Sequence, residues 1–407
     1  MSSTKVTLIV AMIACFDVKI FGVDFNDFRK LQRENQCQKC DLRWADLSGL
    51  DLSHANLSQS DLTGVNLENA ILEDVDLSGA TLNHGNLKGA ILKRVILHDA
   101  DLVGANLSSA DMFDAQGIYA DFSHAEMIGV NLRRASFIKS NFSGTEMSES
   151  NFEYTQLEDS NFMHATLDRA VIILSHLEKV KFTGVHAFRV DFRNSNLKET
   201  DFVNSKVKES DFRGADLSRA DLRGANLNGS NLTGAILDQS DFTMARMEKV
   251  NLHAANIRKV TMLGTRLSRS QLRQANVYDV MMDNAILYQV DAKGSNLRRS
   301  SMRGVNLIEA DLSDSDLAEV AMERVMGQGA DFSYSNFFEA NLTEANLSSA
   351  SLVGSILTSA TLYRTLLMNG DLFGADLRDT KLEGAVLCDT ILPDGNLNIS
   401  CNTLIKN

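Results

Sequence analysis

Proline and tryptophan each occur once in the 407 residues, and aromatic residues make up only 7% of the chain. No segment has the composition of a disordered or low-complexity linker. The longest apolar run, VTLIVAMIACF at residues 6–16, has eleven residues, whereas a membrane-spanning helix needs about 20. We therefore expect no transmembrane span, and a core built from leucine, alanine and phenylalanine.

What the chain has instead is a five-residue repeat. Residues 215–232 read ADLSRADLRGANLNGSNL: a small residue, Asp or Asn, a large apolar residue and two polar positions. From Leu42 to Leu392 the register continues without an insertion for 71 units, and the central position departs from a large apolar residue only at Gly117, Ala187, Ala292 and Gly327. The small and the central residues therefore point inward, and the other three positions point to solvent.

A period of five matches neither an α-helix nor a long strand, so the chain must turn a corner in each unit. The number of units in one coil follows from phenylalanines spaced 20 residues apart, at Phe122, Phe142, Phe162, Phe182 and Phe202. Four units per square coil would stack these side chains. The repeat thus predicts about 18 coils at a strand spacing of ~4.8 Å, a rod about 85 Å long.

Glycine and histidine alternate at the last position of successive units on one face, at Gly104, His124, Gly144, His164 and Gly184. Glycine permits a positive φ at a tight bend and leaves room for a neighbouring imidazole. The histidines of this column, which include His84, are two coils apart, about 9.6 Å, too far to share one metal ion. We interpret them as surface packing.

Both ends of the solenoid need caps, since bare coils would fray or pair edge to edge. We divide the chain into a leader at 1–23, a helical cap with a CxxC motif at 24–40, the repeat β-helix at 41–392 and a C-terminal cap at 393–407. A short helix is expected over residues 24–36, with its N-terminus capped by Asp24 and an apolar face made of Phe25, Phe28 and Leu31.

The apolar run at residues 6–16 follows a single positive charge, Lys5, and fits the apolar region of a secretory signal peptide. It predicts export to the periplasm or the extracellular space. Residues 12–15, MIAC, resemble a lipoprotein cleavage box that would leave Cys15 as a lipid anchor. The alternative is an apolar strand or helix that stays on the protein and covers the open end of the core.

The remaining cysteines form one close pair at each end of the repeats, Cys37 with Cys40 and Cys388 with Cys401. The first pair lacks the βαβ context of a thioredoxin-like motif and the further ligands of a zinc site. The second pair flanks the turn signal LPDG at residues 392–395. Two disulfides are the favoured interpretation, and they imply an oxidising compartment.

The net charge of −13 is unevenly distributed. Residues 41–130 carry −10 and 311–407 carry −9, whereas 221–310 carry +4. Stacked cations would lie about 5 Å apart, which is mildly unfavourable unless an anionic ligand offsets the repulsion. The candidate site for an acidic protein, a polyanion or a lipid headgroup consists of Arg246, Lys249, Arg266, Arg269, Arg273 and Lys293; the alternative is a solvated surface.

The A(D/N)LxG units resemble the pentapeptide-repeat family, whose fold is a right-handed quadrilateral parallel β-helix. The resemblance implies an all-β solenoid with a short N-terminal helix cap. The end segments CQKCDL and CDTILPDGNLNISC further resemble an exported bacterial branch of the family.

An uninterrupted register offers no inserted loop in which to build an active site. We expect no catalytic residue, cofactor or metal, and the acidic balance argues against direct nucleic-acid binding. The first hypothesis is an exported, non-enzymatic, rod-shaped scaffold that binds a protein or an envelope polyanion, as a monomer or a homodimer. The alternative, taken from the family, is a cytoplasmic DNA mimic that binds or protects a type II topoisomerase.

Overall fold

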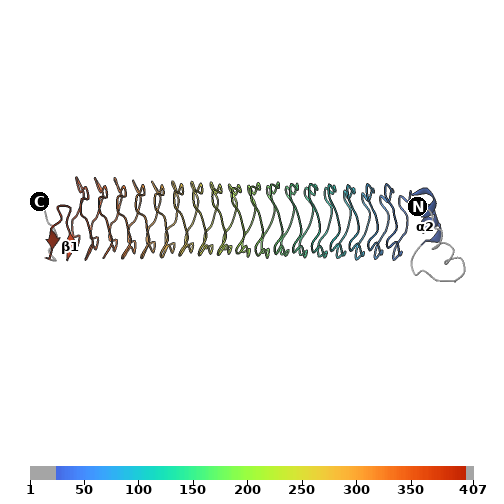
Figure 1. Cartoon of the computed structure of the whole chain (residues 1–407), viewed down its shortest axis with the longest axis horizontal. Helices are drawn as coiled ribbons and strands as arrows, with labels where there is room; N and C mark the ends of the chain where they lie inside the picture. Colours follow the sequence, from blue (N-terminus) through green and yellow to red (C-terminus); the bar gives the residue numbers. More distant parts are fainter. Residues whose placement is uncertain (1–23, 400–407) are drawn as a thin grey trace.

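The computed structural model describes residues 24–399, which form a straight rod of stacked square coils (Figure 1). One short helix lies at the N-terminal end and one small hairpin at the C-terminal end. The predicted all-β solenoid, a right-handed quadrilateral parallel β-helix with an N-terminal helix, is confirmed.

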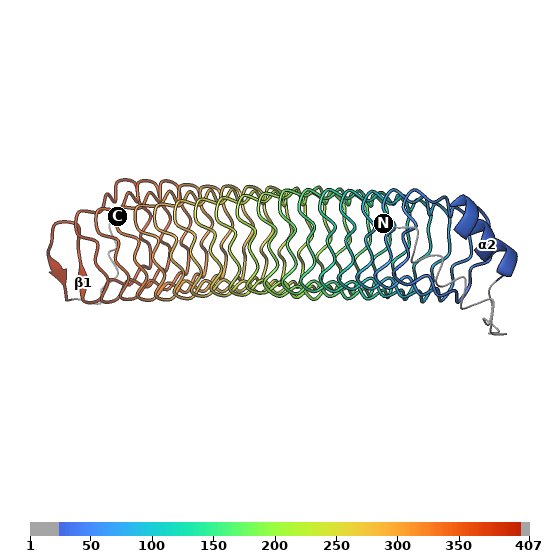
Figure 2. The ribbon, with the colours of Figure 1, turned by 45° about the vertical axis from the view of Figure 1, so that its right-hand side comes forward.

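The coils are joined by a ladder with a constant offset of 20 residues. Every fifth residue from Gln36 to Asp371 forms a parallel bridge with the residue 20 positions later. The main-chain N–H of Leu42, for example, donates to the oxygen of Asp61 at 2.8 Å. Four units therefore make one coil, as the phenylalanine spacing predicted, and each coil contacts only the coils on either side of it (Figure 2).

The core is a set of stacked side chains of one kind. The rings of Phe122 and Phe142 are parallel, with centroids 5.0 Å apart, and Phe142 and Phe162 follow at 4.7 Å. Phe137 packs edge-on against Phe122 from the neighbouring file, at 5.3 Å. All four rings are at most 1% exposed, so the predicted phenylalanine column is confirmed.

A tight turn forms each corner. In the first unit the N–H of Ala45 donates to the oxygen of Leu42 at 3.1 Å, and Trp44, the third turn residue, has φ +61°. The same position has φ near +60° along the whole rod, whether or not it is glycine. The conformation is that of a type II turn. Glycine is therefore not required for the positive φ, which corrects one of the two reasons expected for it.

The second expected role of glycine, to leave room for the neighbouring imidazole, is confirmed. A Cβ atom added to Gly104 would lie 2.8 Å from Nδ1 of His84, and one added to Gly184 would lie 2.7 Å from Nδ1 of His164. Each imidazole thus covers the glycine of the following coil. Among residues 24–399, the histidines of this column join no cluster of metal-ligating atoms.

The Asp and Asn residues of the repeat accept hydrogen bonds from the main chain of their own turn. Oδ1 of Asp61 accepts hydrogen bonds from the N–H and the hydroxyl of Thr63, at 3.0 and 2.6 Å. This local bond stabilises the bend. Many of the inward-facing serines donate to a carbonyl of the preceding coil, as Ser60 does to Cys37 at 2.6 Å, and others, such as Ser160, donate to the carbonyl three residues earlier. The repeated Asp and Asn residues are therefore structural.

Helix α2 (Phe25–Glu34) covers the first coil. Oδ1 of Asp24 accepts from the N–H of Asn26 at 2.8 Å, which is the predicted N-cap. Phe28 and Leu31 are buried, but Phe25 is 47% exposed and lies under the guanidinium of Arg29. The apolar face is therefore narrower than predicted, because the exposed ring of Phe25 packs against Arg29 of the helix itself.

At the other end, strands β1 (Thr390–Ile391) and β2 (Leu397–Asn398) pair antiparallel. The N–H of Gly395 donates to the oxygen of Leu392 at 2.9 Å, so the chain folds back at the predicted turn. None of the helices within residues 24–399 has the length and apolar character needed to cross a bilayer.

Candidate protein-interaction surface

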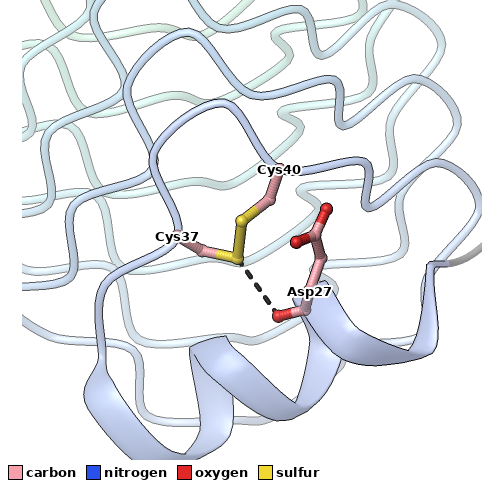
Figure 3. Close-up of side chains that lie close together, drawn as sticks. All are labelled: Asp27, Cys37 and Cys40. Carbon is pink, nitrogen blue, oxygen red and sulfur yellow. Dashed lines mark hydrogen bonds between the residues drawn. A yellow bond between two sulfur atoms is a disulfide. The ribbon is translucent and has the colours of Figure 1, made fainter.

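The N-terminal cysteine pair is a disulfide. Cys37 and Cys40 are joined, with their Cα atoms 5.4 Å apart, between α2 and the first coil (Figure 3). Both are at most 3% exposed. The main-chain oxygen of Asp27 lies 3.1 Å from Sγ of Cys37, and its carboxylate accepts from the N–H of Asp41 at 2.9 Å. The disulfide therefore closes the loop that leads from the helix into the first coil, packs against the helix at Asp27 and is shielded from solvent.

Only one cysteine of the C-terminal pair lies among the described residues. Cys388 is buried at 7% exposure in the last coil. Cys401 lies outside the described residues, as do Cys15 and the leader at 1–23. The second disulfide, the lipid anchor and export therefore stay predictions.

The six basic residues predicted as a binding site all lie exposed on the solenoid. Arg246 and Arg266 are bridge partners in the ladder, so they stack one coil apart, as predicted. Lys249 occupies the third turn position of the same unit as Arg246, and Arg269 occupies that position one coil later. These four residues therefore share one face.

Three of the six basic residues have a side-chain partner. Nε of Arg273 lies 2.5 Å from Oδ2 of Asp291, and Nζ of Lys293 lies 3.0 Å from Oδ2 of Asp314. Nε of Arg269 donates to the side-chain oxygen of Gln289 at 3.0 Å.

Within residues 24–399, Arg246, Lys249 and Arg266 make no side-chain hydrogen bond or ion pair; we call these three residues the cationic patch. The acid nearest in sequence, Glu248, is engaged elsewhere, because its carboxylate accepts a hydrogen bond from the side chain of Asn228. The patch thus presents three uncompensated positive charges.

Many other charges are paired within one repeat unit, which the sequence analysis missed. Arg223 donates from Nε and Nη2 to the carboxylate of Asp221, at 2.8 and 2.6 Å. The signal is the string Asp-Leu-Arg or Asp-Phe-Arg, in which both polar residues point outward from one bend. The same bidentate arrangement joins Asp41 with Arg43, Asp191 with Arg193, Asp211 with Arg213, and Asp376 with Arg378.

These pairs shift the ionisation of their members. The hydrogen bonds from the Arg378 side chain lower the pKa of Asp376 to about 2. The hydrogen bond to Asp221 likewise raises the pKa of Arg223 above its ordinary value. In each of these five units the carboxylate is paired with the guanidinium of its own unit, so the acidic columns are interrupted by basic groups.

A cluster of three residues with metal-ligating side chains, which the sequence analysis did not single out, lies on another face of the solenoid. Ligand atoms of Glu158, His176 and Glu178 all lie within 4.8 Å of one another. The signal was available: two glutamates occupy the same position 20 residues apart, and the histidine precedes the second by two residues, on the same side of the bend.

Comparison with sequence families gives one match, to the family described as pentapeptide repeats (8 copies). It matches residues 40–79, 76–112, 118–153, 175–214, 215–253, 251–289, 285–324, 328–363 and 371–398. A search of curated proteins finds no match to this chain.

Several similar solved structures are those of pentapeptide repeat proteins. HetL, a pentapeptide repeat protein involved in heterocyst differentiation regulation in the cyanobacterium Nostoc sp. strain PCC 7120, is 24% identical over 66% of this chain and 92% of its own, with a TM-score of 0.17. A trypsin-treated form of QnrB1, a plasmid-mediated fluoroquinolone resistance protein, is 20% identical over 45% of this chain and 89% of its own, with a TM-score of 0.23. A protein of the Arabidopsis thaliana thylakoid lumen is 28% identical over 26% of this chain and 70% of its own, with a TM-score of 0.19.

Proposed function

The chain belongs to the pentapeptide repeat family, and on that premise we propose that it is a non-enzymatic, rod-shaped scaffold that binds an acidic protein through the cationic patch. The observation that carries the proposal is the contrast between Arg246, Lys249 and Arg266, which have no side-chain partner among the described residues, and the paired cations beside them. The partner binds through surface carboxylates.

The like charges of the cationic patch repel each other, and the free protein does not relieve this repulsion. Arg246 and Arg266 are held one strand spacing apart by the ladder, so their like charges cannot separate by a movement of the backbone. A carboxylate placed between them would accept charge-assisted hydrogen bonds from both guanidinium groups. Binding to such a partner is expected to weaken with salt.

A protein suits this surface better than an extended polyanion does. The patch covers two coils, and the whole chain carries a net charge of −13, which would repel a long polymer of negative charge beyond the patch. A folded partner can place a few carboxylates on the patch and present neutral or basic groups to the rest of the rod. If the material captured in the experiment below is an envelope polyanion and not a protein, the proposal of a protein partner is wrong.

The test is site-specific crosslinking in cells that express the full chain, with a photoreactive residue in place of Ser268. Arg246→Glu with Arg266→Glu should abolish the crosslinked partner. The matched control, Arg213→Glu with Arg223→Glu, makes the same change of charge on paired arginines. Undiminished capture by the first variant, or its loss in both, would contradict the proposal.

Export is a second part of the proposal, supported by the Cys37 to Cys40 disulfide and by the apolar run at residues 6–16. Cell fractionation with thiol alkylation tests it. An oxidised, shortened chain outside the cytoplasm is expected. A reduced, full-length cytoplasmic chain would favour the topoisomerase-binding alternative, although the intra-unit Asp–Arg pairs interrupt the continuous acidic face that DNA mimicry requires.

A further inference from the structure

Glu158, His176 and Glu178 lie together on a face formed by successive coils. Glu158 and Glu178 occupy the same position one coil apart, and His176 is on the same unit as Glu178. Nδ1 of His176 lies 3.8 Å from Oε1 of Glu178. The ladder fixes the spacing of the three backbone positions, so the three side chains converge without a loop.

The carboxylates of this cluster are incompletely satisfied. Oε2 of Glu158 and Oε2 of Glu178 are both buried and have no hydrogen-bond partner. Glu178 is held in place from its other oxygen, which accepts a hydrogen bond from the side chain of Asn196. Glu158 takes part in no side-chain hydrogen bond or ion pair among residues 24–399. Buried carboxylate oxygens without a partner are costly, and a bound cation would satisfy both of them.

The neighbouring cations do not compensate these charges. Nζ of Lys198 lies 3.1 Å from Oδ2 of Asp216, and Nζ of Lys179 lies 4.0 Å from Oε2 of Glu199. Nζ of Lys139 lies 3.4 Å from the hydroxyl of Tyr119. Among the described residues, the two carboxylates one coil apart therefore face each other with no lysine or arginine paired to either of them.

We propose that Glu158, His176 and Glu178 bind one divalent transition-metal ion, with Zn²⁺ as the best match. One imidazole nitrogen and two carboxylate oxygens are ligands that Zn²⁺ accepts, and the ion would offset both carboxylates at once. Asn196 orients Glu178 in the manner of an outer-shell partner. The site departs from the expectation of no metal, because its ligands are brought together by stacking and not by a sequence motif.

The proposal is tested with ZnCl₂ and the full chain, freed of metal by a chelator and carrying no affinity tag. Calorimetric titration should show one Zn²⁺ bound per chain. Glu158→Gln and His176→Ala should each weaken binding at least tenfold. Co²⁺ in place of Zn²⁺ should give a visible absorption band that both variants lose.

His186→Ala is the matched control. Nδ1 of His186 lies 2.9 Å from Oδ1 of Asp168, an ordinary exposed pair without a second carboxylate in reach of one metal ion. This variant should bind Zn²⁺ as the unmodified chain does. Far-ultraviolet circular dichroism confirms that each variant is folded. Absence of stoichiometric binding by the unmodified chain, or unchanged affinity in Glu158→Gln, would overturn the proposal.

Discussion

The imidazole of His124 occupies the space beside Gly144: a Cβ atom at position 144 would lie 2.7 Å from Nδ1 of the histidine in the preceding coil. Gly144 and Gly234 have nearly the same φ, +66° and +65°, but a Cβ atom at Gly234 would meet nothing within 4 Å. The two glycines therefore separate the effect of backbone conformation from the effect of crowding.

Gly144→Ala should destabilise its coil by about 1 kcal/mol more than Gly234→Ala, because both substitutions place alanine at positive φ but only the first displaces a side chain. Amide hydrogen exchange of the surrounding residues measures the difference. The double variant His124→Ala with Gly144→Ala should regain only the part caused by crowding, so that the loss attributable to position 144 falls to that of Gly234→Ala. Equal effects of the two single substitutions would show that the imidazole does not restrict position 144.

Much of this architecture follows from the sequence, because each inward position is repeated every five residues and each file every 20. The stacking of Phe122 on Phe142 and of Arg246 on Arg266 both follow from that register. The partners of the long surface side chains do not follow from that register. Arg269 meets a glutamine and Arg273 an aspartate, a difference set by side-chain conformation on neighbouring coils.

Substitution of Phe142 tests how rigidly the core is packed. Its side chain is fully buried between Phe122 and Phe162, so Phe142→Ala leaves a cavity that the fixed coil spacing cannot close. The free energy of local opening should fall by about 3–5 kcal/mol. Hydrogen exchange around residue 142 measures this, with the partly exposed Phe338→Ala as the control. Similar losses in both variants would argue against a rigid core.

Asp376 tests the intra-unit pairs. Hydrogen bonds from Arg378 lower its pKa to about 2, below the ordinary value of about 3.9. A folded-state pKa below the unfolded one means that the pair's contribution to stability is present above about pH 4 and disappears as the pH falls through about 2. Carbon-13 NMR of the carboxyl group should show this low value in the unmodified chain. Arg378→Gln should raise it, and an unchanged titration would show that the arginine does not cause the shift.

The disulfide between Cys37 and Cys40 should stabilise one end of the rod and not its middle. Each coil contacts only its neighbours, so the loss of a terminal contact spreads inward by local opening and not by global unfolding. The double variant Cys37→Ser with Cys40→Ser should expose amides of α2 and the first coils to exchange, while those around Phe182 stay protected. Because Phe28 and Leu31 also bury the helix, part of its protection should remain. Loss of protection along the whole rod would mean that the solenoid unfolds as one unit, and that the cap controls the stability of every surface on it.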